Sequence, residues 1–207
     1  MKKVFIEHSS GAYQRLFERL GFEVVYAPDA ADVVCFTGGA DVTPSMYGAS
    51  QHPHTANDPY RDDKESRLYR FCIGNNIPMV GICRGGQFLN VMSGGEMYQH
   101  VEKHCGYHEI IDVDSGETVL VSSTHHQMMK PSKQGALIAY SNLQGSREWY
   151  EGHIFKKDIS DQDIEVVYYK HSNCLCFQPH PEFFRPEEEL PRMTTYFGEL
   201  VAKFLVN

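Results

Sequence analysis

The sequence lacks the features that would place it in a membrane or in an oxidising compartment. No apolar run approaches the ~20 residues that a membrane-spanning helix needs. The N-terminal segment reaches a charged residue, Glu7, too early for a secretory signal. The six cysteines lack the paired, regular spacing of a disulfide framework. We therefore expect a cytoplasmic protein in which Cys35 and Cys72 are buried small hydrophobic side chains.

Positive charge is also scarce. The formal net charge is -8, and no Lys/Arg cluster is longer than a pair such as Lys156-Lys157. A basic surface is what attracts phosphates, so this charge argues against a general nucleic-acid binder. The 207 residues show no internal repeat, low-complexity tract or linker. They predict a single domain, 1–207, large enough that its core needs neither a metal nor a disulfide for stability.

Strand and helix patterns alternate through the first half of the chain. The expected elements are strands at 4–6, 22–26, 32–36 and 78–82, and helices at 13–20, 62–73 and 87–92. Strands separated by helices of this length imply crossover connections and a largely parallel sheet.

The second half changes character, because its short strand candidates have no long helices between them. These candidates are 110–113, 118–121, 137–139, 164–169 and 175–177. They predict antiparallel hairpins, followed by a final helix at 193–205. The acidic run 186–189 is expected to be the solvated segment before that helix. The predicted fold class is therefore α/β, with a flavodoxin-like, open, mostly parallel central sheet flanked by helices and a smaller antiparallel sheet from the second half.

The most informative segment is Gly-Ile-Cys-Arg-Gly at 81–85, at the junction of an apolar strand and a helix. A nucleophile on such a sharp turn is held in a strained backbone, so the residues two before and two after it must be small. The turn places the sulfur of Cys83 at the edge of the sheet where open α/β sheets bind their ligands. The helix N-terminus there favours a thiolate. The alternative is a buried cysteine whose glycine neighbours serve only close packing.

A cysteine nucleophile needs a base, and the base needs an orienting partner. His180 follows the strand candidate at 175–177, is flanked by two prolines, and precedes Glu182 by two residues. These two side chains could supply both functions. The alternative is a turn histidine beside a solvated glutamate.

The Gly38-Gly39 pair follows the third expected strand. Two glycines permit positive φ and close backbone approach, so their amides could complete an oxyanion hole. A simple turn is the alternative.

Together these motifs resemble the class I (triad) glutamine amidotransferase superfamily, which also contains the γ-glutamyl hydrolases. The resemblance covers residues 4 to about 184, with the motifs in family order. It implies that Cys83 is the nucleophile, His180 the base and Glu182 the orienting carboxylate. It also implies that the amides of Gly39 and Arg84 face the oxyanion.

Further segments resemble the stand-alone γ-glutamyl hydrolase branch, which includes enzymes acting on small γ-glutamyl amines. These segments are 38–48, 61–65, 90–91 with 94–95, and 123–127. By this resemblance, the pocket for the glutamyl α-amino and α-carboxylate groups would be lined by Gln87, His125, His126 and Gln127. An amino-acid head group needs several such fixed polar partners. Pro179 departs from the family, which usually has an aromatic residue there, and this could alter the pocket wall beneath the leaving group.

The chain is rich in histidine, so a metal site is an alternative use of these residues. His100, His104, Cys105 and His108 fall within nine positions, and helical spacing could pair His104 with His108. Gly106 interrupts that stretch, and no second cysteine pair has zinc-ribbon spacing. We therefore expect histidines of the surface or the pocket rim, with no metal and no organic cofactor.

The predicted activity is hydrolysis of the γ-glutamyl amide bond of a small conjugate through a γ-glutamyl thioester, which releases glutamate. One alternative is a glutaminase subunit that supplies ammonia to a synthetase partner. Another is a catalytically inactive regulatory or binding domain. The expected ligand is a small γ-glutamyl amide or glutamine, with no nucleic acid and no membrane. Pocket walls beyond the glutamyl site would select the leaving group, namely Tyr47 and segments 51–60 and 145–152.

Overall fold

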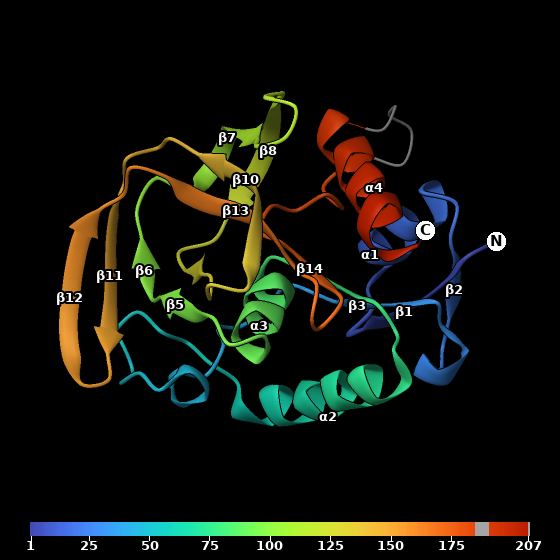
Figure 1. Ribbon diagram of the computed structural model, residues 1–207, viewed down its shortest axis with the longest axis horizontal. Coiled ribbons are helices and arrows are strands. Elements are labelled where there is room, and N and C mark those ends of the chain that lie inside the picture. Colours follow the sequence, from blue (N-terminus) through green and yellow to red (C-terminus); the bar gives the residue numbers. More distant parts are fainter. Residues whose placement is uncertain (185–190, 207) are drawn as a thin grey trace.

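A nine-stranded mixed sheet forms the centre of the protein, in a computed structural model that describes residues 1–184 and 191–206 (Figure 1). The acidic run at 186–189 lies outside the described residues. The strands of this sheet are β1 (Lys3–Glu7), β2 (Glu23–Val25), β3 (Val33–Phe36), β4 (Met79–Ile82), β7 (Cys105–Asp112), β8 (Thr118–Thr124), β10 (Gly135–Ser141), β13 (Asp163–Tyr169) and β14 (Cys174–Phe177). Their order across the sheet is β2-β1-β3-β4-β14-β13-β10-β7-β8.

The half of the sheet from β2 to β14 is parallel, as the alternation of strands and helices predicts. Its helices are α1 (Gly11–Arg19), α2 (Pro59–Asn75), α3 (Arg84–Met92) and α4 (Arg192–Leu205), with short 3-10 turns at Pro28–Ala30 and Pro44–Tyr47. Helix α2 begins where Asp58 accepts hydrogen bonds from the amides of Tyr60 and Arg61, each at 3.1 Å, and Pro59 occupies its first position.

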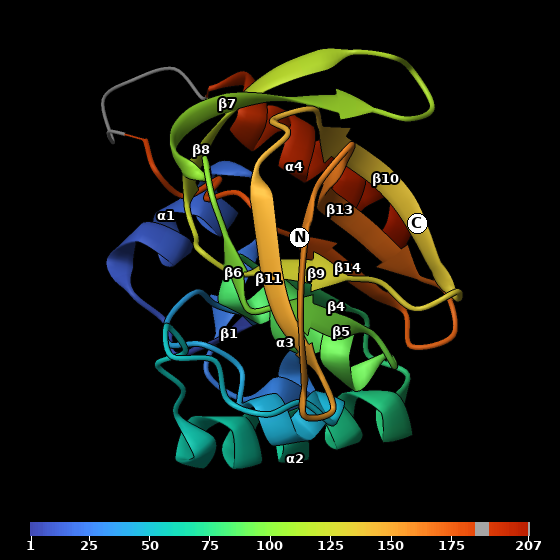
Figure 2. The ribbon, with the colours of Figure 1, turned by 90° about the vertical axis from the view of Figure 1, so that its left-hand side faces the viewer.

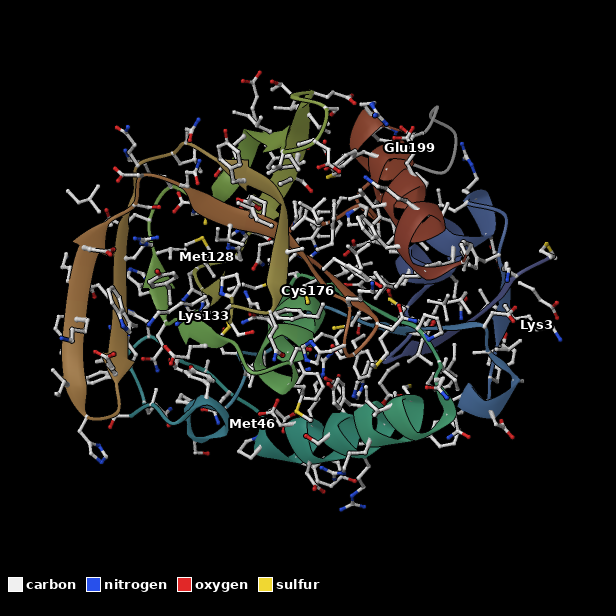
Figure 3. All side chains as sticks on the ribbon, in the orientation of Figure 1. Lys3, Met46, Met128, Lys133, Cys176 and Glu199 are labelled. Carbon is white, nitrogen blue, oxygen red and sulfur yellow. The ribbon has the colours of Figure 1, made fainter. Side chains whose placement is uncertain are left out.

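The helices cover both faces of the sheet, which creates two apolar cores. Buried residues of α1 and α4 pack in one core, and buried residues of α2 and α3 pack in the other. Successive residues of β3, Val33 and Val34, point into different cores because side chains alternate along a strand. Cys35 and Cys72 are fully buried, as predicted. Cys176 of β14 lies in the middle of the molecule (Figure 3).

The predicted α/β architecture is confirmed, and the antiparallel strands of the second half are arranged in two ways. Strands β13, β10, β7 and β8 continue the central sheet from β14. The smaller sheets consist of β5 (Glu96–Tyr98) with β9 (Met128–Lys130), and of β6 (His100–Val101) with β11 (Ser146–Glu151) and β12 (Ile154–Ile159). Figure 2 shows the β11–β12 hairpin facing the viewer, away from the parallel half. No helix in the described parts of the chain is long and apolar enough to cross a membrane.

Candidate active site

Cys83 lies in the sharp turn between β4 and α3, where the sequence predicts a nucleophile. Its backbone has φ 52 and ψ -115, and a positive φ is unusual for a residue with a side chain. The amide of Cys83 donates to the carbonyl of Phe177 at 2.7 Å, and its own carbonyl accepts from the amide of Gln87 at 3.0 Å. Backbone strain of this kind costs about 1–3 kcal/mol and persists only where the surroundings impose it.

The two glycines around the turn are required by backbone packing. A Cβ atom on Gly81 would overlap the carbonyl group of Gly85, and one on Gly85 would overlap the carbonyl of Phe36 on β3. The two arms of the turn therefore lie directly against each other, and the second arm also lies against the backbone of β3. This is the steric reason that the sequence spacing suggested.

His180 and Glu182 form a buried pair after the end of β14. Nδ1 of His180 lies 2.7 Å from Oε1 of Glu182, so the ring donates from Nδ1 to the carboxylate. Burial lowers the pKa of His180, but interactions with Cys83 and Glu182 outweigh it and raise the pKa to about 10. The ring is therefore in its doubly protonated, positively charged form near neutral pH.

Three distant segments meet at Gly38. A Cβ atom built on Gly38 would lie 3.3 Å from Cε1 of His180 and 3.7 Å from Cβ of Cys83. Nε2 of His180 is buried and makes no hydrogen bond of ordinary geometry with any described residue. The ring is nevertheless close enough to the Cys83 thiol for that group to help raise its pKa.

The side chain of Arg61, in α2, holds the loop that contains Gly38 and Gly39 by hydrogen bonds to its carbonyl groups. The guanidinium donates to the carbonyl of Gly38 at 2.9 Å and to that of Thr37 at 2.8 Å. A Cβ atom on Gly39, where φ is +147, would overlap this guanidinium. The Arg61 side chain also donates to Glu65 at 2.7 Å. The two glycines thus allow the loop backbone to rest directly on a buried arginine.

The side chain of Arg84 belongs to the same ionic network as Arg61. It forms buried ion pairs with Asp62 and Glu65, and its Nε donates to the carbonyl of Ala40 at 3.1 Å. The backbone amide of Arg84 is not part of this ionic network. Arg84 is the first residue of α3, so that N–H has no acceptor within its own helix. The side chain therefore braces the turn, and only the amide remains a candidate oxyanion donor.

A cavity of about 190 Å³ opens at Cys83. It is smaller than the roughly 300–1,000 Å³ of typical drug-sized ligand sites, so its size suits an amino-acid head group. The structure brings the predicted pocket residues together here. The lining consists of Gly39, Ala40, Asp41, Ala56, Cys83, Arg84, Gln87, Thr124, His125, His126 and Gln127.

The carbonyl of Gln127 is the common acceptor in the cavity wall. It accepts from Nε2 of Gln87 at 2.9 Å and lies 2.8 Å from Nδ1 of His125. Nε2 of His126 lies 3.3 Å from the carboxylate of Asp41, and this hydrogen bond is the main reason that the pKa of His126 is raised. The wall is therefore fixed by internal hydrogen bonds before any ligand binds.

A family model for Peptidase C26 matches residues 23–182. The chain belongs to this family. Similar proteins include a glutamine amidotransferase-like protein, YvdE, of Lactococcus lactis subsp. lactis, which is 28% identical over 210 residues, covering 86% of this chain and 81% of that protein. A carbamoyl phosphate synthase small chain of Helicobacter acinonychis is 26% identical over 152 residues, covering 72% of this chain and 35% of that protein. A solved glutamine amidotransferase from Thermotoga maritima matches with a TM-score of 0.59 at 15% identity, covering 99% of this chain and 85% of that one, which shows a shared fold.

Two aromatic residues of this Peptidase C26 chain contact the candidate triad and were missed from the sequence. The hydroxyl of Tyr13, in α1, accepts from the amide of Gly38 at 3.0 Å. Burial, and next the charge of Glu182, raise the pKa of Tyr13, so it remains a phenol that holds the glycine loop close to the Glu182 carboxylate. The ring of Phe183 stacks on His180. Tyr13 carried no local signal beyond its helix, whereas Phe183 adjoins Glu182 in the sequence.

The expectation that the histidines near position 104 lie at the surface or pocket rim is wrong for His104 and His108, which are buried. Strand β7 begins at Cys105, so residues 104 and 108 follow strand rather than helix geometry and point to the same inner side. Cys105 is exposed and His100 is partly buried. The rings of His104 and His108 are 5.3 Å apart, centre to centre.

Proposed function

We propose that this Peptidase C26 protein hydrolyses the γ-glutamyl amide bond of small γ-glutamyl conjugates and releases glutamate. Cys83 is the nucleophile, His180 the general acid and base, and Glu182 the orienting carboxylate. The observation that carries this proposal is the strained turn that holds Cys83 beside the buried His180–Glu182 pair. A plain structural cysteine would need neither the strain nor the neighbouring protonated imidazole.

In the proposed reaction the substrate γ-carbonyl lies against Cys83, with its oxygen toward the amides of Gly39 and Arg84. The sulfur attacks the carbonyl carbon to give a tetrahedral oxyanion, and one such donor is typically worth roughly 10²–10³ in rate. Collapse expels the amine, which takes its proton from His180. The resulting γ-glutamyl thioester is hydrolysed by a water that gives its proton to the same histidine, which regenerates the thiol–imidazole pair.

The cavity supplies partners for the glutamyl head group. We assign Gln87, His125, His126 and Gln127 to the α-amino and α-carboxylate groups of the substrate. Asp41, which also lines the cavity, provides negative charge next to His126 and suits an α-ammonium group. The small volume and the internal bracing of the wall support a ligand in which only the head group is enclosed, so that the amine leaves toward solvent.

The test is hydrolysis of a panel of γ-glutamyl amines and anilides, with glutamine included, by purified protein. Cys83→Ala should abolish turnover while the circular dichroism spectrum and substrate binding remain. Glu182→Gln should reduce the rate less than Cys83→Ala, because the carboxylate orients the base and does not react. Mass spectrometry of the quenched reaction should show one γ-glutamyl group on wild-type protein and none on Cys83→Ala. Full activity of Cys83→Ala would refute the proposal.

A second candidate is a glutaminase subunit that passes ammonia to a synthetase. It is favoured by the likeness to a protein named as a carbamoyl phosphate synthase small chain. The same panel distinguishes the two. Preference for larger γ-glutamyl amides over glutamine supports the stand-alone hydrolase. Activity confined to glutamine, and stimulated by a synthetase, supports the subunit.

A further inference from the structure

A group of buried polar side chains adjoins the cavity and shares His125 with it. We call it the histidine–carboxylate cluster, and its members are His104, His108, His125, Asp163 and Glu165. His104 is 1% exposed, His125 4% and Glu165 0%. The proposed reaction uses none of these side chains except His125, so the burial of two carboxylates among three histidines requires another explanation.

Within the histidine–carboxylate cluster, several atoms are left without hydrogen bonds. His108 Nε2 lies 2.9 Å from Oε1 of Glu165, but Oε2 of Glu165 has no partner among the described residues. His125 uses Nδ1 to bond the carbonyl of Gln127, and its Nε2 is likewise unpaired within residues 1–184 and 191–206. Buried polar atoms are nearly always satisfied, so each unpaired atom needs an occupant. Both ring nitrogens of His104 and both carboxylate oxygens of Asp163 are also without a hydrogen bond among the described residues. Imidazole nitrogens and carboxylate oxygens are atoms that bind cations.

The ring of His104 lies beside His125 and Glu165. Ligand atoms of His104, His125 and Glu165 all lie within 4.8 Å of one another. Around a tetrahedral ion with bonds of about 2.0–2.2 Å, ligand atoms are roughly 3.4 Å apart. Small inward movements of the three side chains would therefore complete the geometry. The charge also fits, because a divalent cation would neutralise the two buried carboxylates.

The neighbours of these three residues match the outer partners of a metal site. A metal-bound histidine normally donates its other ring N–H to a carbonyl or a carboxylate, which fixes the tautomer. His125 has the carbonyl of Gln127 at 2.8 Å. His104 has Nε2 at 3.2 Å from the carboxylate of Asp163, and its Nδ1 lies 3.5 Å from Glu165. His125 therefore bonds an outer acceptor through Nδ1, and each nitrogen of His104 lies within ion-pair distance of a buried carboxylate.

We propose that His104, His125 and Glu165 bind a zinc-like divalent cation. Two imidazoles and one carboxylate are a ligand set that zinc commonly takes, with a fourth position left for water. The cation would hold the ring of His125, and through it the carbonyl of Gln127, in the cavity wall. Because both ring nitrogens are then engaged, His125 serves the head-group site by positioning that carbonyl and not by a hydrogen bond of its own to the substrate. It would also join the start of β7 to β13. The cation would stabilise the cavity wall and would take part in no step of the proposed reaction.

The test is zinc binding by the full chain with any affinity tag removed. Protein stripped with a chelator is titrated with Zn²⁺ alone, against a competing chromophoric chelator, and thermal unfolding is recorded in parallel. We expect one zinc per chain and a rise in Tm. Glu165→Gln should lose stoichiometric binding, and the outer variant Asp163→Asn should bind about 10–100-fold more weakly. His171→Gln, which alters an exposed histidine outside the cluster, should bind like wild type.

Misfolding of a variant is separated from loss of a ligand by His104→Cys, because a thiolate also binds zinc. This variant should retain binding, and its Co²⁺ form should gain the thiolate-to-metal absorption that the wild-type Co²⁺ form lacks. The absence of zinc uptake by wild type would overturn the proposal, as would equal affinity in wild type and a folded Glu165→Gln. Neither result bears on the reaction at Cys83, which the assays above test independently.

Discussion

Phe183 lies face to face with the imidazole of His180, with ring centroids 4.4 Å apart and ring planes at 2° to each other. Phe183 is 51% exposed, so its side chain contacts the histidine without being part of the hydrophobic core. Aromatic contacts are worth about 0.5–1.5 kcal/mol beyond the area they bury. The stack therefore restrains the orientation of the His180 ring.

Phe183→Ala should lower kcat/KM for γ-glutamyl amide hydrolysis roughly two- to tenfold, because the imidazole loses this restraint. Tm should change little. Phe183→Tyr preserves the stacked ring and should keep the wild-type rate. If the alanine variant is as active as the tyrosine variant, Phe183 does not position His180.

Replacing Cys83 by glycine should give a more stable protein than replacing it by alanine, by about 1 kcal/mol. The usual order is the reverse, but only glycine adopts φ 52 with ψ -115 without strain. Neither variant has a nucleophile, so both should lack turnover. Urea unfolding of the two variants measures the difference. A more stable alanine variant would mean that the turn is not strained in solution.

Gly85→Ala should destabilise the protein by about 3 kcal/mol or more, because the added methyl group meets the backbone of β3. Gly74→Ala is the matched control. Gly74 lies in α2 with open space around its Cα, so alanine there should stabilise by roughly 0.5–1 kcal/mol. Chemical denaturation measures the change in the free energy of unfolding for each variant. A decrease for Gly85→Ala with an increase for Gly74→Ala would support this account, and similar changes for the two substitutions would contradict it.

The parts of the site that the sequence predicted are those with local signals. The glycine spacing around Cys83 reflects the shape of one turn, and the separation of His180 from Glu182 fits within one loop. The alternation of strands and helices likewise fixes the parallel half of the sheet. Each of these follows from residues only a few positions apart, so pattern and spacing are sufficient to find them.

The parts that were missed depend on contacts between distant segments. Arg84 could be placed beside the nucleophile, but its burial against Glu65 depends on how α2 packs on α3. Tyr13 meets Gly38 only because β1, β3 and α1 come together. His104 was expected at the surface or the pocket rim because Gly106 interrupts the histidine stretch and no second cysteine pair has zinc-ribbon spacing. Its burial depends on the distant residues His125, Asp163 and Glu165. Such residues have no periodic or spacing signal in a single sequence.

Glu65→Gln should destabilise the protein by about 3–5 kcal/mol, because it leaves the buried guanidinium groups of Arg61 and Arg84 without their shared carboxylate. Asp63→Asn in the same helix is the control. It breaks an exposed ion pair with Arg67, and such pairs are worth about 0–1 kcal/mol. Urea denaturation at fixed pH compares the two. A small effect of Glu65→Gln would show that the network is not the support of the glycine loop and the Cys83 turn.

The raised pKa of His180 predicts how this residue contributes to stability as pH changes. The folded pKa is about 10, above the ordinary value of 6.5, because the contacts with Cys83 and Glu182 outweigh burial. Between these values the folded state holds a proton that the unfolded state has released, so the free energy of unfolding falls as pH rises. The stabilising contribution is complete below about pH 6.5 and is lost as pH approaches about 10.

His180→Gln removes this titration and serves as the reference. The difference in free energy of unfolding between wild type and His180→Gln should decrease steadily from about pH 6 to about pH 9.5 in urea titrations. Glu182→Gln should lower the pKa of folded His180, because the interaction with Glu182 is lost while the contact with Cys83 remains. In that variant the stabilising contribution of His180 should therefore be lost at a lower pH than in wild type. A difference that stays constant or grows with pH would mean that the folded state does not hold a proton on His180, and the leaving amine would then need another acid.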